Sequence, residues 1–205
     1  MLIKIQRIIN INELAMNFLS YIFKLYYTRN SKIHKSSKIS RFSRIVDSEI
    51  DKYSYVGVST VVRNARIGKF CSIAQNVKIG AGEHPINLVS TSPVFYTNKN
   101  DFKFSFFTNN NVHERRKTFI ANDVLIGANV FIRDGIKIGN DAIIGANSFV
   151  NKDVLDYEIV GGVPARHLKF RFKKSNINRL LEDKWWDWEI EKIKKNEEYF
   201  TKRLQ

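Results

Sequence analysis

Residues 120–154 read IANDVLIGANVFIRDGIKIGNDAIIGANSFVNKDV. In this stretch an aliphatic side chain returns every six residues, and a second aliphatic or small side chain follows each of them by four. The first series is Ile120, Ile126, Ile132, Ile138, Ile144 and Val150, and the second is Val124, Val130, Ile136, Ala142, Ser148 and Val154. A period of six fits neither an amphipathic helix nor an alternating strand. It predicts a solenoid in which short extended segments alternate with bends and the aliphatic side chains stack inside.

The same period recurs more loosely in residues 31–82. It begins at Ile33, breaks near residues 50–53, and we expect it to resume at Tyr55, Val61, Ile67, Ile73 and Ile79. Cys71 falls at an inward small-residue position, so we interpret it as a buried thiol rather than a nucleophile. Together the two regions predict about five coils, ~4.8 Å apart.

Residues 80–119 interrupt the period. A long insertion in a solenoid typically projects from one face, and often from the binding face. It carries His84 and a dense aromatic group, in which Phe102, Phe104 and Phe106 alternate as in a strand with one apolar face. Two interpretations stay open: a hairpin that docks on a neighbouring subunit, and the wall of an acceptor pocket.

The two ends differ from the solenoid. In residues 1–28, polar residues spaced by three or four form a narrow stripe on an otherwise apolar helix. That helix either packs on protein or lies in a membrane interface. A helical pattern returns from Ser175 onward. We therefore expect an N-terminal amphipathic helix (1–30), a solenoid (31–165) with an inserted loop (80–119), and a C-terminal basic segment and helix (166–205).

The composition limits the class of protein. With 205 residues, of which 43% are hydrophobic, the chain can bury one substantial core. A single cysteine excludes an intramolecular disulfide and favours a reducing, cytoplasmic compartment. The formal net charge of +14 favours an anionic cofactor or substrate over nucleic acid, because no nucleic-acid-binding motif is present.

Over about residues 31–195 the sequence resembles the xenobiotic acetyltransferase branch of the hexapeptide-repeat acyltransferases. The matching motifs are FCSIA at 70–74, GEHP at 82–85, VSTSP at 89–93, NDVLIGAN at 122–129, GGVPAR at 161–166, RF at 171–172 and WWDW at 185–188. The resemblance implies an all-β fold, a left-handed parallel β-helix, and a homotrimer with its active sites between subunits. It also implies a cytoplasmic enzyme, or one at the inner face of the membrane if residues 1–28 touch lipid.

The resemblance also implies the chemistry. His84 stands at the position of the family's catalytic histidine, where a neutral imidazole can take the proton of an attacking hydroxyl. Glu114 is a candidate to orient it. Acetyl-CoA is the expected co-substrate, and no metal is expected. Its contacts would be the backbone at Ala128 and Ala146, then Asn151 and Lys152, with Arg166, Lys169 and Arg171 at the phosphates.

The acceptor is less constrained. Ser92 stands where many antibiotic-modifying members carry a second histidine, and with Phe95 and Tyr96 it favours the polysaccharide branch. We therefore expect O-acetylation of a sugar hydroxyl in surface polysaccharide (O-antigen or capsule) synthesis. The alternatives are O-acetylation of an antibiotic (streptogramin or chloramphenicol), N-acetylation of an amino-sugar nucleotide, and a non-catalytic scaffold. Leu125 replaces a tryptophan that the family often carries near the cofactor groove.

Overall fold

The computed structural model of this chain describes residues 25–98, 100, 102, 104–107 and 116–204. Most of the expected N-terminal helix (1–30) therefore lies outside the described residues. His113 and Glu114 lie outside them as well.

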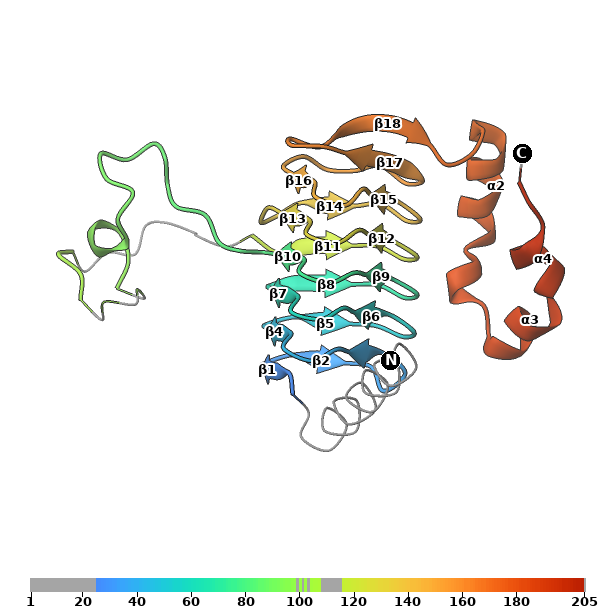
Figure 1. Cartoon of the computed structure of the whole chain (residues 1–205), viewed down its shortest axis with the longest axis horizontal. Coiled ribbons are helices and arrows are strands. Elements are labelled where there is room, and N and C mark those ends of the chain that lie inside the picture. Colours follow the sequence, from blue (N-terminus) through green and yellow to red (C-terminus); the bar gives the residue numbers. More distant parts are fainter. Residues whose placement is uncertain (1–24, 99, 101, 103, 108–115, 205) are drawn as a thin grey trace, which may run out of the picture.

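The described chain winds into a parallel β-solenoid with three sheets, as the period of six predicts (Figure 1). The first sheet contains β1 (Tyr27–Arg29), β4 (Arg44–Val46), β7 (Val61–Arg63), β10 (Lys78–Ile79), β13 (Phe131–Ile132) and β16 (Phe149–Val150). The second contains β2 (Lys32–Ile33), β5 (Glu49–Ile50), β8 (Ala65–Ile67), β11 (Thr118–Ile120) and β14 (Lys137–Ile138). The third contains β3 (Lys38–Ile39), β6 (Tyr55–Val56), β9 (Ser72–Ile73), β12 (Leu125–Ile126), β15 (Ile143–Ile144), β17 (Glu158–Gly161) and β18 (Arg166–Phe170).

The strand count corrects the expectation of about five coils, because the third sheet alone holds seven strands. The apparent break near residues 50–53 is not an end of the solenoid. Tyr27 pairs with Arg44, so a coil in this half takes 17 residues, whereas Leu125 pairs with Ile143 and a later coil takes 18. The bend between the first and second sheets is one residue shorter in the early coils.

This shorter bend also corrects the expected phase. Tyr55 points outward and is exposed, whereas its neighbour Val56 is fully buried. Likewise Val62 is fully buried in place of Val61, and the predicted phase returns at Ile67, whose side chain is buried. Side chains alternate between the inner and outer faces of a strand. A bend that is one residue shorter therefore exchanges the residues predicted to face inward with their neighbours.

The core is a column of aliphatic side chains inside the coils. Most are fully enclosed, and burying one such side chain contributes about 1.5–3 kcal/mol. Its largest fully buried members include Ile45, Ile67, Ile73, Ile79, Ile126, Ile132 and Ile144. The bends turn through residues with positive φ, among them Asn76, Asn129 and Asn147, and asparagine tolerates that conformation well.

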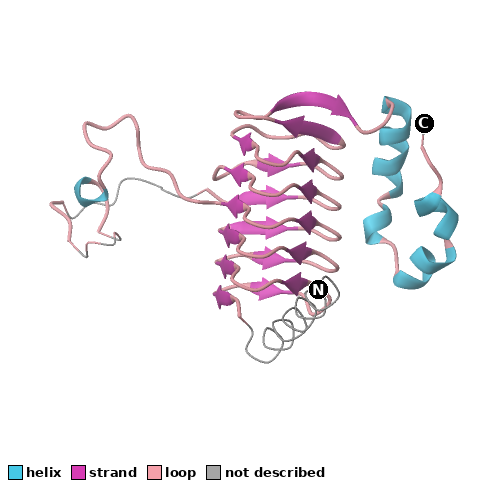
Figure 2. Cartoon of the chain, in the orientation of Figure 1, coloured by secondary structure: helices cyan, strands magenta, loops and turns pink. Residues whose placement is uncertain are grey.

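The C-terminal end is closed by β17 and β18, which pair antiparallel. The helix predicted from Ser175 is confirmed as α2 (Lys174–Asp183). A 3-10 turn, η2 (Trp185–Asp187), then leads to two short helices, α3 (Ile190–Lys195) and α4 (Glu197–Thr201), which Figure 2 shows beside the solenoid. Among the described helices, none has the length and apolar character needed to cross a membrane.

The C-terminal helices attach along the bend between the second and third sheets. Trp185 packs on Phe70 with ring centroids 5.0 Å apart, and Phe70 stacks on Tyr53 one coil below. Asp187 accepts a 2.9 Å ion pair from Lys69. Trp185 and Asp187 thus anchor the tail on the solenoid.

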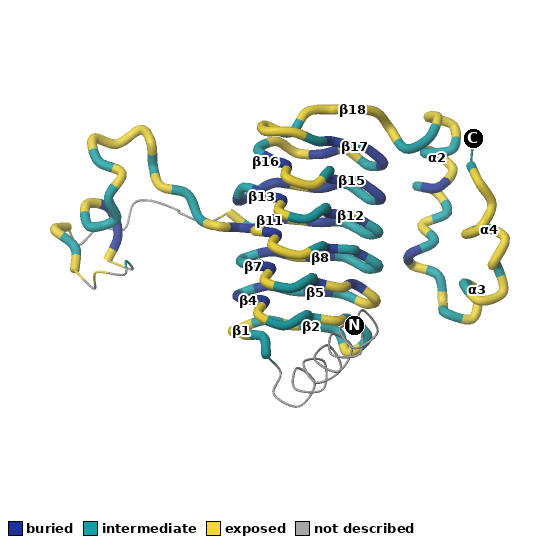
Figure 3. Tube along the Cα trace, in the orientation of Figure 1, coloured by how far each residue is buried: buried dark blue, intermediate teal, exposed yellow. Residues whose placement is uncertain are grey.

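The insertion leaves the solenoid after β10 and projects away from it as an arm (Figure 1). Its regular element is the 3-10 turn η1 (Pro93–Phe95). The alternating strand expected around Phe102, Phe104 and Phe106 is wrong for the described residues, which form no strand there. Their side chains are largely exposed, as the tube in Figure 3 shows for this arm. The described residues of the arm pair with no strand of the described solenoid, which leaves both interpretations of the insertion open.

Candidate active site

The imidazole of His84 is held through Nδ1. This nitrogen lies 2.8 Å from the carbonyl oxygen of Thr91 and 3.0 Å from the hydroxyl of Tyr96. A carbonyl oxygen can only accept a hydrogen bond, so the network assigns the proton to Nδ1. Nε2 then carries the lone pair. Since His84 is exposed on the arm, Nε2 can act as a base on a group that approaches from outside.

Tyr96 gives the imidazole a firm support. Its side chain is only 4% exposed, directly after η1, and its ring meets His84 edge-on with centroids 6.4 Å apart. Next to it, Phe95 stacks on Phe106 at 5.2 Å. Tyr96 therefore holds the side of the imidazole opposite Nε2, and an exposed pair of stacked phenylalanines lies next to it in sequence.

The root of the arm is fastened to the solenoid on the N-terminal side of His84. The Gly82 amide donates to Asp134 Oδ1 at 3.0 Å. Arg133 donates to both oxygens of Glu83 at 2.7 Å each, and Arg116 lies 3.8 Å from the same carboxylate. The hydrogen bond from Arg133 lowers the pKa of Glu83. Two consecutive residues before the histidine are thus tied to the bend that follows β13.

Ala128 and Ala146 follow β12 and β15 on successive coils. The Asn147 amide donates to the Ala128 carbonyl at 2.8 Å, which joins the two bends directly. A Cβ added to Gly127 would lie 2.5 Å from the Ala146 nitrogen. Glycine at this position therefore lets the coils approach closely, and the two alanines form one low, continuous surface.

Three other predicted contacts line one cavity of about 180 Å³ at the C-terminal end of the solenoid: Asn151, Lys152 and Arg166. The Oδ1 atom of Asn151 is buried, and no described side chain or backbone group donates to it. A buried acceptor without a donor is costly, and an amide N–H of a pantetheine arm would satisfy it. The residues present therefore fit part of a coenzyme A molecule.

A bulge in the last hairpin brings Arg166 and Lys169 to one side. Arg166 pairs with Gly161 and Lys169 pairs with Ile159, with an irregularity in register between them. Gly161 and Ile159 are two residues apart on β17, so they share a face, and so do their cross-strand partners. Strict alternation would have put the two basic residues on opposite faces.

Arg171 lies in a different environment from the other predicted phosphate ligands. Its guanidinium donates to Asp141 at 3.0 Å, lies 3.7 Å from Asp123, and packs 5.1 Å from the Phe172 ring centroid. Burial and the neighbouring Asp123 carboxylate raise the pKa of Asp141 to about 8. Arg171 thus links the C-terminal segment to two bends. A role at the phosphates stays a prediction that competes with this ion pair.

The remaining described histidines lie apart from His84. His34 Nδ1 is 2.9 Å from the Ser36 hydroxyl, and His167 Nδ1 is 2.8 Å from Glu158. In the part of the chain that the structure describes, no three histidine, cysteine or carboxylate side chains are placed to hold a metal ion.

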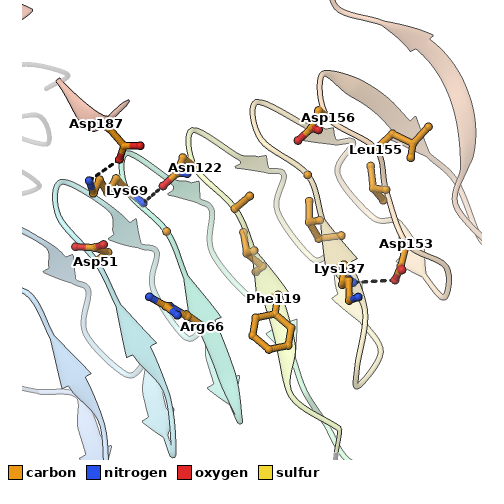
Figure 4. Close-up of a pocket in the computed structure, with 16 residues that line it drawn as sticks. Asp51, Arg66, Lys69, Phe119, Asn122, Lys137, Asp153, Leu155, Asp156 and Asp187 are labelled. Carbon is orange, nitrogen blue, oxygen red and sulfur yellow. Dashed lines mark hydrogen bonds and ion pairs between the residues drawn. The ribbon is translucent and has the colours of Figure 1, made fainter. Parts of the chain in front are cut away.

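A larger groove, of about 740 Å³, lies on the second sheet (Figure 4). It contains none of the predicted site residues. Two of its carboxylates make structural contacts. Asp153 accepts from the Lys137 amide at 2.8 Å, and Asp187 pairs with the Lys69 ammonium. These contacts stabilise the coils and the tail, and the groove lining contains no histidine.

Sequence reasoning missed Tyr96, Arg133 and the Thr91 carbonyl as parts of the site, and it did not use Glu83. One signal was present: the segment Arg133-Asp134 puts two charged residues into a solenoid bend just before Gly135. Nothing in the sequence joined that bend to the arm, because 50 residues separate Glu83 from Arg133.

Comparison with known proteins agrees with the solenoid fold. Residues 117–152 match the bacterial transferase hexapeptide (six repeats) family. The chain is 41% identical over 132 residues to a chloramphenicol acetyltransferase from Escherichia coli, which covers 62% of this chain and 61% of that protein. It is 36% identical over 179 residues to a probable macrolide acetyltransferase from Lysinibacillus sphaericus, which covers 82% of this chain and 89% of that protein.

Among solved structures, AntD, an N-acyltransferase from Bacillus cereus in complex with dTDP and 3-hydroxybutyryl-CoA, superposes with a TM-score of 0.53. It is 21% identical and covers 78% of this chain and 89% of that structure. This similarity concerns the fold. The chain spans about 61% of the length of the chloramphenicol acetyltransferases it matches.

Proposed function

This chain belongs to the xenobiotic acetyltransferase branch of the hexapeptide-repeat acyltransferases, and on that premise we propose that it transfers an acetyl group from acetyl-CoA to a hydroxyl of a small molecule. The observation that carries the proposal is the state of His84. Its Nδ1 donates to the Thr91 carbonyl, which leaves Nε2 as a free base at an exposed position.

His84 Nε2 accepts the proton of the acceptor hydroxyl while the hydroxyl oxygen forms a bond to the acetyl carbon. The Thr91 carbonyl stabilises the resulting imidazolium through Nδ1–H. His84 then returns the proton to the departing thiolate sulfur as the carbon–sulfur bond breaks. The acetyl group ends as an ester, the thiol is restored, and His84 is again neutral.

The coenzyme would lie along the surface formed by Ala128 and Ala146. Asn151 Oδ1 is available to accept from an amide of its pantetheine arm, with Lys152 near by. The shared face of Arg166 and Lys169 would meet its phosphates. Arg171 would have to break its ion pair with Asp141 to contact a phosphate. We therefore rank it behind Arg166 and Lys169 as a phosphate ligand.

A homotrimer completes this proposal. The arm that carries His84 projects away from its own solenoid (Figure 1). Its exposed aromatic residues, which include Phe102, Phe104 and Phe106, are unpaired with the described strands. Docking the arm on another copy would bury this apolar surface and bring His84 to that copy's coenzyme surface.

For the acceptor, we favour an antibiotic hydroxyl over the sugar hydroxyl expected from Ser92. The relatives that support this choice are acetyltransferases named for chloramphenicol and for macrolides. A sugar hydroxyl is the second candidate, because Ser92 replaces a histidine that many antibiotic-modifying members carry.

The test uses the full chain, acetyl-CoA labelled in its acetyl group, and panels of antibiotics and of nucleotide- or lipid-linked sugars. Mass spectrometry locates the label. His84→Ala should lower turnover about 10²–10⁴-fold while acetyl-CoA still binds. His34→Ala is the matched control and should leave turnover unchanged. Unchanged turnover in His84→Ala would refute the role of His84 as the base. Absence of acetyl-CoA binding to the parent chain would refute the assignment as an acetyltransferase.

A further inference from the structure

The first coil of the solenoid carries a regular series of basic residues. They occupy every third position from residue 29 to residue 44: Arg29, Lys32, Lys35, Lys38, Arg41 and Arg44. No aspartate or glutamate lies between residues 29 and 46. Side chains on one face of a strand repeat every two residues, and those along a helix stripe alternate between three and four. A constant spacing of three fits neither, so the path of the chain decides where these charges lie.

The solenoid converts this spacing into a ring. Arg29 lies in β1, Lys32 in β2 and Lys38 in β3, and these three strands are the edges of the three sheets. Lys35 and Arg41 lie in the turns between them. The last member, Arg44, lies in β4, which pairs with β1, so the series returns to the first sheet just short of one full coil. The six basic positions therefore go around the N-terminal rim of the solenoid, whose edge strands β1 and β2 are labelled in Figure 1.

Most of this charge is not neutralised within the described part of the chain. The side chains of Lys32, Lys35 and Lys38 are exposed and make no ion pair there. Arg29 lies 3.6 Å from Asp47, and the Arg44 guanidinium lies over the Tyr27 ring.

The next coil offsets the charge of Arg29 through Asp47, and its strand carboxylate is already paired. Its nearest strand carboxylate, Glu49, pairs with Lys117 at 3.2 Å and with Arg66 at 3.8 Å, both from later coils. The rim thus presents positive charge at the end of the molecule while the charges above it are paired.

Protection of edge strands explains part of this pattern. Charged side chains, lysine above all, prevent edge strands from pairing with other chains. Charges of both signs would give that protection, yet the ring contains one sign only. A single sign around an end face favours an anionic partner, and a flat partner can meet all sides of the ring together.

The chain before the ring favours a lipid partner. Residues 1–24 lie outside the described part, and in sequence they directly precede Leu25, two residues before β1. Their sequence is mostly apolar, with a polar stripe that includes Gln6, Asn10, Glu13 and Asn17 and a few polar residues outside it. Anionic headgroups would complement the ring, and the apolar residues would complement the headgroup–acyl boundary.

We propose that the N-terminal end of this solenoid docks end-on against an anionic lipid bilayer, with the basic ring of the first coil against the headgroups. The solenoid axis then stands away from the membrane, and β17, β18 and α2 lie at the distal end. The arm with His84 leaves the side of the solenoid and stays accessible. This surface is independent of the acetyl-transfer chemistry.

Flotation of the full chain with vesicles tests the proposal. One set is phosphatidylcholine mixed with phosphatidylglycerol, and the other is phosphatidylcholine alone. Replacing Lys32, Lys35 and Lys38 with serine should weaken binding to the anionic vesicles roughly a hundredfold. The control replaces the exposed Lys174, Lys195 and Lys202 of the C-terminal segment with serine, which removes the same charge. It should change binding less than about threefold, and raising the salt should weaken the parent more than the ring variant.

Three outcomes would overturn the proposal. Equal losses in both triple variants would assign binding to net charge. Equal binding of the parent to neutral and anionic vesicles would assign it to apolar residues alone. Tighter, ring-dependent binding to duplex DNA than to anionic vesicles would assign the ring to nucleic acid. Thermal unfolding of each variant serves as the check that the fold is intact.

Discussion

The carboxylate of Glu83 and the guanidinium of Arg133 meet through two parallel contacts of 2.7 Å. This fork joins the root of the arm to a solenoid bend that lies 50 residues further along the chain. The residue after Glu83 is His84. The orientation of the proposed base therefore depends on an ion pair that no local sequence rule predicts.

Breaking the fork should reduce turnover more than it reduces acetyl-CoA binding. In Glu83→Gln the bidentate contact is lost, the arm moves relative to the coenzyme surface, and kcat should fall about tenfold to a hundredfold. Steady-state kinetics and acetyl-CoA titration measure the two effects separately. Glu49→Gln removes another partly exposed ion pair and should leave kcat unchanged. Partial recovery of kcat in the double variant Glu83→Arg with Arg133→Glu would support the role of this ion pair in orienting His84. An unchanged kcat in Glu83→Gln would contradict that role.

Tyr96→Phe should lower the turnover of the enzyme. The Tyr96 hydroxyl accepts, beside the Thr91 carbonyl, from Nδ1–H of His84. Loss of one acceptor removes part of what holds the imidazole, so kcat should fall about twofold to tenfold while acetyl-CoA binding is unchanged. The control Tyr55→Phe lies on the outer face of the third sheet and should leave kcat unchanged. Steady-state kinetics measure the effect, and an unchanged kcat in Tyr96→Phe would show that the Thr91 carbonyl holds the imidazole without the tyrosine.

Gly127→Ala should destabilise the solenoid. The added Cβ would lie 2.5 Å from the Ala146 nitrogen, and backbone cannot move aside as a side chain can. Overpacking of this kind costs about 1–3 kcal/mol. Gly145→Ala is the matched control, because its nearest neighbour would be 3.4 Å away and ordinary contact results. Denaturant unfolding of both variants measures the difference, and equal stabilities would show that the coils can separate at Gly127.

Asp141→Asn should change how stability depends on pH. Burial and the nearby Asp123 carboxylate together raise the pKa of Asp141 to about 8. Between its unfolded value and about 8 the folded state binds the extra proton, so the contribution of this group falls as pH rises. The variant should therefore gain stability relative to the parent, by a few kcal/mol at most, between about pH 5 and about pH 9.

Asparagine suits the backbone at this position. Asp141, between β14 and β15, has a φ of 57°, and Asn147, in the next bend between β15 and β16, has a φ of 60°. Thermal unfolding across the pH range measures the effect. A constant difference between parent and variant at all pH values would show that the Asp141 carboxyl is ionised throughout.

The sequence by itself determined the solenoid and the place of its interruption. A period of six from Ile120 to Val150 has one compact solution, in which each aliphatic side chain stacks on the next coil. The insertion with His84 and the C-terminal helix were also predictable, because each is a local change of pattern. Where the pattern shortened by one residue, as between Ile45 and Ile50, local reading assigned the wrong face to Tyr55 and Val61.

Tertiary structure alone decided the contacts between distant segments. Arg171 was a candidate phosphate ligand in sequence, yet Asp123 and Asp141 reach it only because successive coils place their bends in one column. The fork between Glu83 and Arg133 and the support from Tyr96 arise in the same way. Periodicity reports which side of a coil a residue faces. It carries no information on which residue of another coil, or of an inserted arm, lies opposite, because winding and loop path set those distances.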